Sequence, residues 1–379
     1  MLKIKVEGKE LKGIIEKALC NMDKKAAMPV LTKIVLTDDG DRLTAYTSDI
    51  EGYLQVNTNN YSSIDTGSIG IDEEDLKVLL KMTGEVIITE LEANVLVQNG
   101  KKNIFLQKFD ISDFPNMPEG EFSNVLQFNE NSFAESINNL VTFTSDNESN
   151  KIMRCFHFNI TDSRIETLDG HRIGMKTINE DEKIADKGSI LVNNTIVSDL
   201  KKTLDKKSNN KIILSQSEKC IKVEGNNFTY IQRRVDGEYF RVGQMITDDF
   251  ELSFKADTEE MLSHMKYYTD NVIDKNDKKP VVLKVSNDTV LTYGRNKRFE
   301  VSDSMEIKEH SGNDISIGFN PFFFVDALKI ADADTVSIGG TNHKAPFVIK
   351  ANEYSFLILP VNLNTEIEAM EKYISKVAA

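Results

Sequence analysis

The stretch ETLDGHRIGM, residues 166–175, lies near the middle of the chain, and the rest can be understood as arranged around it. It leaves a predicted strand at 163–167, turns at Asp169 and Gly170, and re-enters an extended run through Ile173 and Met175. Asp-Gly between two alternating runs is a strong hairpin signal, because glycine tolerates positive φ and aspartate can bond its own backbone. The stretch therefore predicts a β-hairpin.

The turn carries His171 and Arg172 beside apolar Leu168 and Ile173. A polar group next to an apolar wall suits a pocket that docks a peptide. Two other interpretations stay open at this point. Asp-Gly-His-Arg in a hairpin is most often a solvated turn, and an enzyme could use Asp169 to orient His171 as a base. The sequence shows no nucleophile or metal cluster that would complete such a catalytic site.

Length and composition indicate an ordinary globular protein. At roughly 100–200 residues per domain, 379 residues predict two to four domains. The chain is 40% hydrophobic, its mean hydropathy is −0.34, and no apolar run approaches the ~20 residues of a membrane span. The N-terminal MLKIKVE alternates like a strand and lacks a signal-peptide core, so we expect a cytoplasmic protein.

Cysteine and histidine usage argues against a metal or disulfide framework. The three cysteines, Cys20, Cys155 and Cys220, are far apart and form no CxxC pair, and the five histidines are scattered. Each cysteine is expected to be a small buried hydrophobe. We predict no metal site and no cofactor.

The net charge of −14 argues, on its own, against a nucleic-acid partner. What matters, however, is the sign of the surface that faces the partner. The positions of the lysines therefore decide the question.

One order of elements, strand–helix–strands–helix–strands, occurs three times at a period of about 125 residues. We predict an α+β fold of three repeated domains, each with two helices against antiparallel sheets, at residues 1–122, 123–246 and 247–379. The third domain carries a C-terminal extension, 364–379. The expected helices cover residues 8–22, 72–82, 130–143, 195–205, 257–269 and 320–330.

Two further patterns support the repeat. Thr47-Ser48-Asp49 and Thr167-Leu168-Asp169 end the equivalent strand in the first two copies. Five of the six helices also carry lysine, although a solvated helix face alone would explain such lysines. The lysines are Lys12, Lys17, Lys77, Lys81, Lys201, Lys202, Lys266 and Lys329.

Seven short motifs recur in a definite order, and together they carry a family resemblance. They are MPVL at 28–31, YTSDIE at 46–51, DFP at 113–115, TLDGHRI at 167–173, VDG at 235–237, GFNP at 318–321 and LILPV at 357–361. Over about residues 1–363 the chain resembles the bacterial sliding clamp, the β subunit of DNA polymerase III. Each motif alone is weak, but their order and spacing are specific.

The resemblance implies a head-to-tail homodimer that closes a ring around duplex DNA, with helices lining the hole. A lysine-bearing lumen would contact phosphates without reading sequence, and the acidic exterior would keep DNA off the outside. The implied protein is a non-catalytic processivity factor whose partners are the DNA polymerase III catalytic subunit, the clamp loader and other clamp-binding-motif proteins. The DNA-binding residues expected by position are Lys12, Lys25, Lys77, Lys81, Lys151, Arg154, Lys201 and Lys202.

The resemblance also implies a pocket for partner peptides between the second and third domains. Its expected residues are Met153, Leu168, Gly170, His171, Arg172, Ile173, Phe240, Gln244, Met245, Pro346, Leu357, Leu359, Pro360 and Val361. Without the resemblance, Leu359-Pro360-Val361 would be taken as an edge strand that ends in proline.

Three features depart from the family pattern. The second domain closes on Tyr239-Phe240-Arg241 where a Phe-Pro step is usual, and Gln244 stands where a basic residue is common. The chain also continues past the Leu-Pro motif through 364–379, whose spacing predicts either a short helix near the pocket or a frayed end. These departures keep open an alternative, a clamp-like paralogue that acts as a protein-binding scaffold outside the main replisome.

Overall fold

The computed structural model describes residues 1–246, 249–275, 279–363 and 365–377. The chain forms two compact units. The first comprises Met1–Asn138, Ile160–Asp162 and Asn179–Asp236, and the second comprises Asn139–Asn159, Ser163–Ile178 and Gly237–Ala379. The predicted mixture of helices with antiparallel sheets is confirmed, whereas the three domain boundaries remain a prediction. No helix within the described residues is long and apolar enough to cross a membrane.

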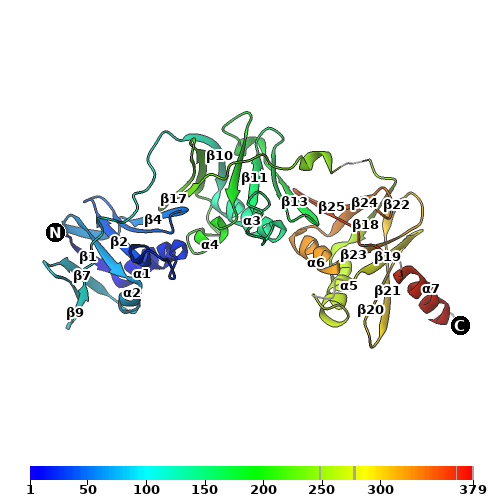
Figure 1. Ribbon diagram of the computed structural model, residues 1–379, viewed down its shortest axis with the longest axis horizontal. Coiled ribbons are helices and arrows are strands. Elements are labelled where there is room, and N and C mark those ends of the chain that lie inside the picture. The colour runs from blue at the N-terminus through cyan, green and yellow to red at the C-terminus, as the bar shows by residue number, and fades with distance from the viewer. Residues whose placement is uncertain (247–248, 276–278, 364, 378–379) are drawn as a thin grey trace. The chain divides into compact units, whose positions relative to one another are not determined.

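The first unit contains two antiparallel sheets, ordered β5-β1-β7-β8-β9 and β10-β15-β16-β17-β4-β3-β2-β6 (Figure 1). Their strands are β1 (Lys3–Glu7), β2 (Lys33–Asp38), β3 (Leu43–Ser48), β4 (Gly52–Thr58), β5 (Tyr61–Asp65), β6 (Gly67–Asp72), β7 (Glu85–Glu90), β8 (Asn94–Asn99), β9 (Lys102–Gln107), β10 (Ser123–Asn129), β15 (Lys211–Gln216), β16 (Cys220–Gly225) and β17 (Phe228–Arg233). The strand β14 (Ser189–Asn193) and the helices α1 (Gly8–Ala18), α2 (Glu73–Leu79) and α4 (Ile196–Asp199) complete this list.

Local sequence explains where the first two helices form. Leu11, Ile14, Ile15 and Ala18 are buried, so α1 presents one apolar stripe at helical spacing to β3 and β4. The helix α2 is capped by Asp72, the residue before it, whose carboxylate accepts a hydrogen bond from the Glu74 N–H at 3.0 Å.

The second unit contains strands in the order β11-β12-β13-β26-β25-β24-β18-β22 and a four-stranded sheet, β21-β20-β19-β23. Its strands are β11 (Cys155–Asn159), β12 (Arg164–Leu168), β13 (Arg172–Thr177), β18 (Leu252–Asp257), β19 (Val281–Ser286), β20 (Thr289–Arg295), β21 (Glu300–Glu306), β22 (Lys308–Ser311), β23 (Ile315–Phe319), β24 (Thr335–Gly340), β25 (Phe347–Ala351) and β26 (Tyr354–Ile358). Its helices are α5 (Thr258–Asn271), α6 (Pro321–Ile330) and α7 (Glu366–Val377), and α3 (Glu130–Leu140) spans the boundary of the two units.

Three hairpins share one turn. Counted between the innermost facing residues of each hairpin, the loops of β3–β4, β12–β13 and β20–β21 are residues 49–52, 169–172 and 296–299. On the outer side, Gly52 and Arg172 already pair as the first residues of β4 and β13. Asp49, Asp169 and Asn296 open these loops, and each side-chain Oδ1 accepts from a backbone N–H two or three residues on. The repeat predicted from the first two copies is therefore present at a third site as well.

The strand that follows this turn obeys one pairing rule within each unit. In the first unit β4 pairs antiparallel with β17, and in the second unit β13 pairs antiparallel with β26. The third such strand, β21, ends its sheet, and so does β9. Within the described residues, β21 follows the shared turn as β4 and β13 do, but it has no partner on its outer side. The strand β9 likewise has no partner on its outer side.

The C-terminal extension forms the helix α7 beside β20 and β21, in red in Figure 1. Met370 is 1% exposed, and it packs with Leu363 against Val282 and Tyr293 of the four-stranded sheet. Of the two predicted possibilities for residues 364–379, the helix is confirmed over Glu366–Val377, while residues 364, 378 and 379 lie outside the described part.

Two expectations from the sequence are wrong in detail. The helix predicted at 195–205 covers only Ile196–Asp199, because tight turns follow: the Lys201 N–H donates to the Ser198 carbonyl and the Thr203 N–H to the Leu200 carbonyl. Three strands, β5, β6 and β22, had not been expected at all.

The short helix α4 ends on a buried carboxyl group. Asp199 is 6% exposed, and its Oδ2 accepts a hydrogen bond from the Tyr230 hydroxyl at 2.6 Å. Gln232 Nε2 donates to the same hydroxyl oxygen at 3.1 Å. Burial, together with the charge of nearby Asp49, raises the pKa of Asp199 to about 7.

This buried carboxyl makes the stability of the first unit depend on pH. The folded form keeps the Asp199 proton up to pH about 7, whereas the unfolded chain loses it near the ordinary value of 3.8. Between these values the folded state binds more protons than the unfolded state. The free energy of unfolding therefore falls by at most about 4 kcal/mol as pH rises from about 4 to 7, and it stays level above pH 7. Asp199→Asn, which still accepts from Tyr230, should remove this decline. Urea midpoints at pH 5 and 8 measure it, and an unchanged decline in the variant would contradict the assignment.

Candidate functional site

The hairpin predicted at residues 166–175 is present and is closed by Asp169. Asp169 Oδ1 accepts hydrogen bonds from the backbone N–H groups of His171 at 2.9 Å and Arg172 at 3.0 Å. Gly170 adopts φ 92°, the left-handed conformation that glycine tolerates. Asp169 thus holds the backbone of the loop and not the ring of His171, which removes the geometry that the enzyme interpretation required.

Arg172 ties this hairpin to the helix α6. Its Nε donates to Asp169 Oδ2 at 2.8 Å, its Nη1 to Asp326 Oδ2 at 2.6 Å, and its Nη2 to the Thr142 carbonyl at 2.7 Å. Its side chain is only 10% exposed. Arg172 lies in the predicted site, but its guanidinium is engaged within the protein, so it positions its neighbours.

Two aromatic rings complete this arrangement. The Arg172 guanidinium lies 4.9 Å from the Phe143 ring centre and 4.5 Å from that of Phe323. His171, which is exposed, stacks on Phe323 with ring centres 6.2 Å apart. Phe323 therefore belongs to the site, although the sequence reasoning missed it. Its signal was the aromatic run at 322–324 directly after the Asn320-Pro321 helix start.

The predicted apolar wall gathers in the second unit. Leu357 and Leu168 lie in a buried cluster, and Met153 and Tyr239 pack against it. Around this cluster three large apolar side chains remain accessible: Phe240 is 39% exposed, Met245 51% and Leu359 38%. An exposed apolar patch beside a buried cluster is typical of a surface that binds another protein. The buried cluster consists of Leu168, Ile173, Met175, Val242, Val348 and Leu357.

The C-terminal strand brings the last predicted residues to the same place. β26 pairs with β13, and the Leu359 N–H donates to the His171 carbonyl at 3.0 Å. The Val361 N–H donates to the Gly318 carbonyl at 2.7 Å. Pro360 lies between these two bonds. Pro346 directly precedes β25, and Gln244 ends the single turn 242–244 with its side chain exposed.

The candidate DNA-binding residues lie on helices and turns. Lys12 is on α1, Lys25 follows the turn after that helix, Lys77 is on α2 and Lys81 follows it. Lys201 and Lys202 lie in the turns after α4, and Lys151 and Arg154 lie in the turn before β11. All are exposed except Arg154, which is half-buried. Their contact with DNA remains a prediction.

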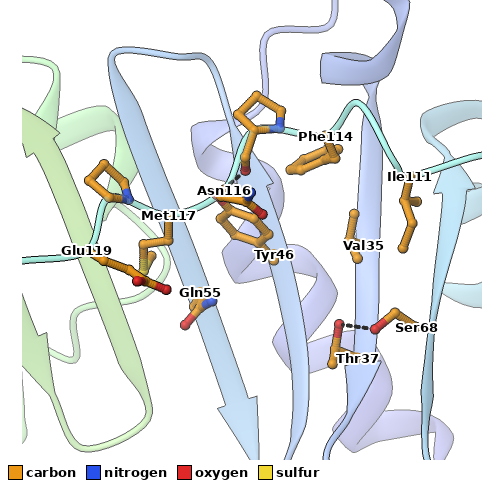
Figure 2. Close-up of a pocket in the computed structure, with 12 residues that line it drawn as sticks. Val35, Thr37, Tyr46, Gln55, Ser68, Ile111, Phe114, Asn116, Met117 and Glu119 are labelled. Atoms are coloured by element: carbon orange, nitrogen blue, oxygen red, sulfur yellow. Dashed lines mark hydrogen bonds between the residues drawn. The ribbon is translucent and has the colours of Figure 1, made fainter.

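A hollow of about 940 Å³ opens in the first unit, where the connection through residues 111–119 crosses β2, β3 and β4 (Figure 2). The Tyr46 hydroxyl donates to the Pro115 carbonyl at 2.6 Å, and its ring meets Phe114 edge-on at 5.2 Å. The DFP motif thus fastens this connection to the sheet. The lining offers hydroxyl and amide groups and one carboxylate, that of Glu119.

Among the described residues, no group of three or more histidine, cysteine, aspartate or glutamate side chains is placed to hold a metal ion. Burial raises the pKa of the Cys155 thiol to about 12, so this cysteine is a poor nucleophile.

Comparison with known proteins agrees with the geometry. Residues 127–240 match the family described as DNA polymerase III beta subunit, central domain, and residues 244–362 match the C-terminal domain of the same subunit. The beta sliding clamp of Bacillus subtilis (strain 168) is 22% identical over 384 residues, covering 95% of this chain and 99% of that protein. That of Lactococcus lactis subsp. lactis is 25% identical over 360 residues, covering 90% and 94%.

Solved structures show the same fold. The crystal structure of the DNA polymerase sliding clamp from Bacillus subtilis superposes with a TM-score of 0.89 at 18% identity, covering 95% of this chain and 99% of that chain. The two domain matches together span more than half of the sequence. The chain belongs to the DNA polymerase III beta subunit family, the family of the bacterial beta sliding clamps.

Proposed function

We propose that this protein is a DNA polymerase processivity factor. Two copies would join head to tail into a ring that encircles duplex DNA and slides without reading sequence. The ring would act in the cytoplasm, without catalytic activity, and would tether the replicative polymerase, the clamp loader and other partners through the peptide site. The observation that carries the proposal is the repeated strand pairing, which leaves two unlike edges, β9 and β21.

The two pairings within the chain follow the same register. Val56, the fourth residue after its loop, pairs with Phe228 of β17. Lys176, the fourth residue after the second loop, pairs with Tyr354 of β26. Phe228 and Tyr354 each open their strand after a two-residue turn. The register is therefore set by the two turns and can be extended to a third pair.

Extended to the free edges, this register joins two copies of the chain. Asp303 is the fourth residue after the third loop, and Lys102 opens β9 after a two-residue turn. The rule sets Lys102 of one copy opposite Asp303 of the other, and places apolar Ile104 opposite Val301. Cross-strand pairs of opposite charge stabilise such a junction. A heterologous contact of this kind closes into a ring when its rotation permits.

Charge supports the same arrangement. Lys101, Lys102 and Lys108 accompany β9, whereas Glu300, Asp303 and Glu306 lie on β21. Edges of opposite sign attract each other, and like edges repel. The exposed Phe105, at 63%, and Phe299, at 42%, lie at these two edges and would become buried in the junction.

The peptide site supports the tethering function. Accessible Phe240, Met245 and Leu359 lie beside a buried apolar cluster and offer apolar contacts to a partner's anchor residues. Methionine and leucine suit a surface that accepts several different peptides, because methionine adapts its shape. The exposed lysines support backbone contacts with DNA, which depend on charge and not on sequence.

Reversing one charge of the proposed junction should weaken the dimer, and reversing both should restore it. Lys102→Glu sets like charges against each other, so the dimer dissociation constant should rise about tenfold or more, and Asp303→Lys should do the same. The two changes together should restore the dimer. Sedimentation measures the dimer, and retention after loading on circular compared with linearised DNA measures encirclement.

Lys187→Glu, an equal charge change in an exposed turn away from β9, is the control and should leave the dimer intact. Failure of the double variant to rejoin would refute the register. Equal retention of the wild-type protein on circular and linear DNA would refute the ring.

A second candidate is a clamp-like paralogue that serves as a protein-binding scaffold outside the main replisome. The Tyr239-Phe240-Arg241 rim and the added helix α7 favour it. Binding of the replicative polymerase's C-terminal peptide distinguishes the two, since the paralogue should not bind it.

A further inference from the structure

A groove of about 680 Å³ lies at the C-terminal end of the peptide site. Pro360 and Val361, which belong to that site, form one part of its lining. Ile367 and Glu368 of the helix α7 form another, and the rest of the lining comes from His343, Lys344, Asn362 and Leu363. The groove therefore shares Pro360 and Val361 with the peptide site, and the helix α7 forms one of its walls.

The helix α7 is a firm wall for this groove. The Arg295 guanidinium donates to both carboxylate oxygens of Glu366, at 2.8 and 3.0 Å, close to the start of the helix. A bidentate arginine–carboxylate pair of this kind fixes the orientation of the two side chains as well as the distance between them. Further along, the rings of Tyr373 and Tyr293 lie 5.6 Å apart, and Met370 is buried. Both the first and the third turn are thus fastened to the four-stranded sheet.

Residues 361–363, which follow Pro360 of the peptide site, are also held in place. Leu363 lies directly over Gly318, since a Cβ at Gly318 would stand 2.2 Å from the Leu363 Cδ2 atom. The Val361 N–H donates to the carbonyl of the same glycine. The contacts of Val361 and Leu363 with Gly318 therefore fix the position of this side of the groove relative to Leu359 and Pro360.

The chemistry of the lining selects for a particular segment. Val361 and Ile367 supply an apolar floor, and both side chains are half-buried. The ammonium group of exposed Lys344 lies on one side, and the carboxylate of exposed Glu368 lies on α7. A short segment that carries an apolar residue beside an acidic one matches the floor and Lys344.

We propose that this groove binds the residues that flank the anchor of a partner peptide, with an apolar side chain on Ile367 and an acidic side chain beside Lys344. The inference rests on the proposed peptide site and deepens it. The added helix then extends the recognised segment beyond the anchor and favours partners whose flank carries that pair of residues.

The test compares two synthetic peptides on the full-length protein. One is a ten-residue anchor peptide cut from the C-terminus of the replicative polymerase, and the other extends it by a leucine–glutamate pair, at either end in separate versions. One of the extended versions should bind about tenfold more tightly than the anchor peptide, as measured by titration calorimetry. Lys344→Glu should remove this gain and leave affinity for the anchor peptide within about twofold.

Lys376→Glu is the matched control, because it makes the same charge change on the exposed last turn of α7, outside the groove. It should keep the tenfold gain. Deleting residues 364–379 should remove the gain while the anchor peptide still binds.

The outcomes separate the two proposals. If the anchor peptide binds but neither extension improves affinity, or if the two lysine variants behave alike, the groove proposal is overturned and the peptide site stands. If the anchor peptide does not bind at all, the peptide site itself is refuted, and the groove falls with it.

Discussion

Leu359→Asp is expected to lower the affinity for the polymerase's C-terminal peptide by about 100-fold or more. Leu359 is 38% exposed at the end of β26, and its backbone is fixed by the hydrogen bond to His171. A carboxylate at this point would have to lose water against an apolar anchor, and such central positions carry most of the binding energy of an interface. Fluorescence anisotropy with a labelled peptide measures the loss.

A matched control is available in the first unit. Ile64 on β5 is 52% exposed and lies outside the proposed site, so Ile64→Asp should leave peptide affinity unchanged. Leu359→Met should also bind normally, because methionine keeps the apolar contact. Unaltered binding by Leu359→Asp, with both controls folded, would show that partners dock elsewhere.

Arg172→Ala is expected to destabilise the second unit by about 3 kcal/mol and to abolish peptide binding as well. The change leaves Asp169 and Asp326 without their cation, and it removes the planar guanidinium group that packs against the rings of Phe143 and Phe323. Leaving such carboxylates partly buried and unpaired is the costly step. Amide hydrogen exchange of β12 and β13 measures the local loss of stability.

Arg172→Lys separates charge from geometry at this position. Lysine restores a positive charge near the two carboxylates, but it cannot form the forked contacts or stack on a ring. We expect it to recover less than half of the lost stability. Full recovery would mean that charge alone matters here, and no loss in Arg172→Ala would contradict the positioning role.

The central hairpin could be predicted from sequence because its causes are local. Asp169 and Gly170 specify the turn by themselves, and Asn320-Pro321 specify the start of α6 in the same way. The peptide-site residues, by contrast, came from the family resemblance. The sequence alone left Leu359-Pro360-Val361 as the end of an edge strand.

The misses have tertiary causes. The strand β5 has a nearly uniform exposed pattern, and only its pairing with β1 defines it. The predicted helix at 195–205 is cut short where Asp199 turns inward to the distant Tyr230. Phe323 enters the site because Arg172, 151 positions away, packs over its ring. No short-range pattern reports such contacts.

The unlike edges β9 and β21 also bear on how newly made chains avoid aggregation. A bare strand edge invites uncontrolled pairing with copies of itself. Here two β9 edges would set Lys102 near another lysine-bearing strand, and two β21 edges would oppose acidic residues. Fibril-like stacking of identical edges is thereby discouraged before assembly. Neutralising one edge should accordingly cost solubility at high protein concentration.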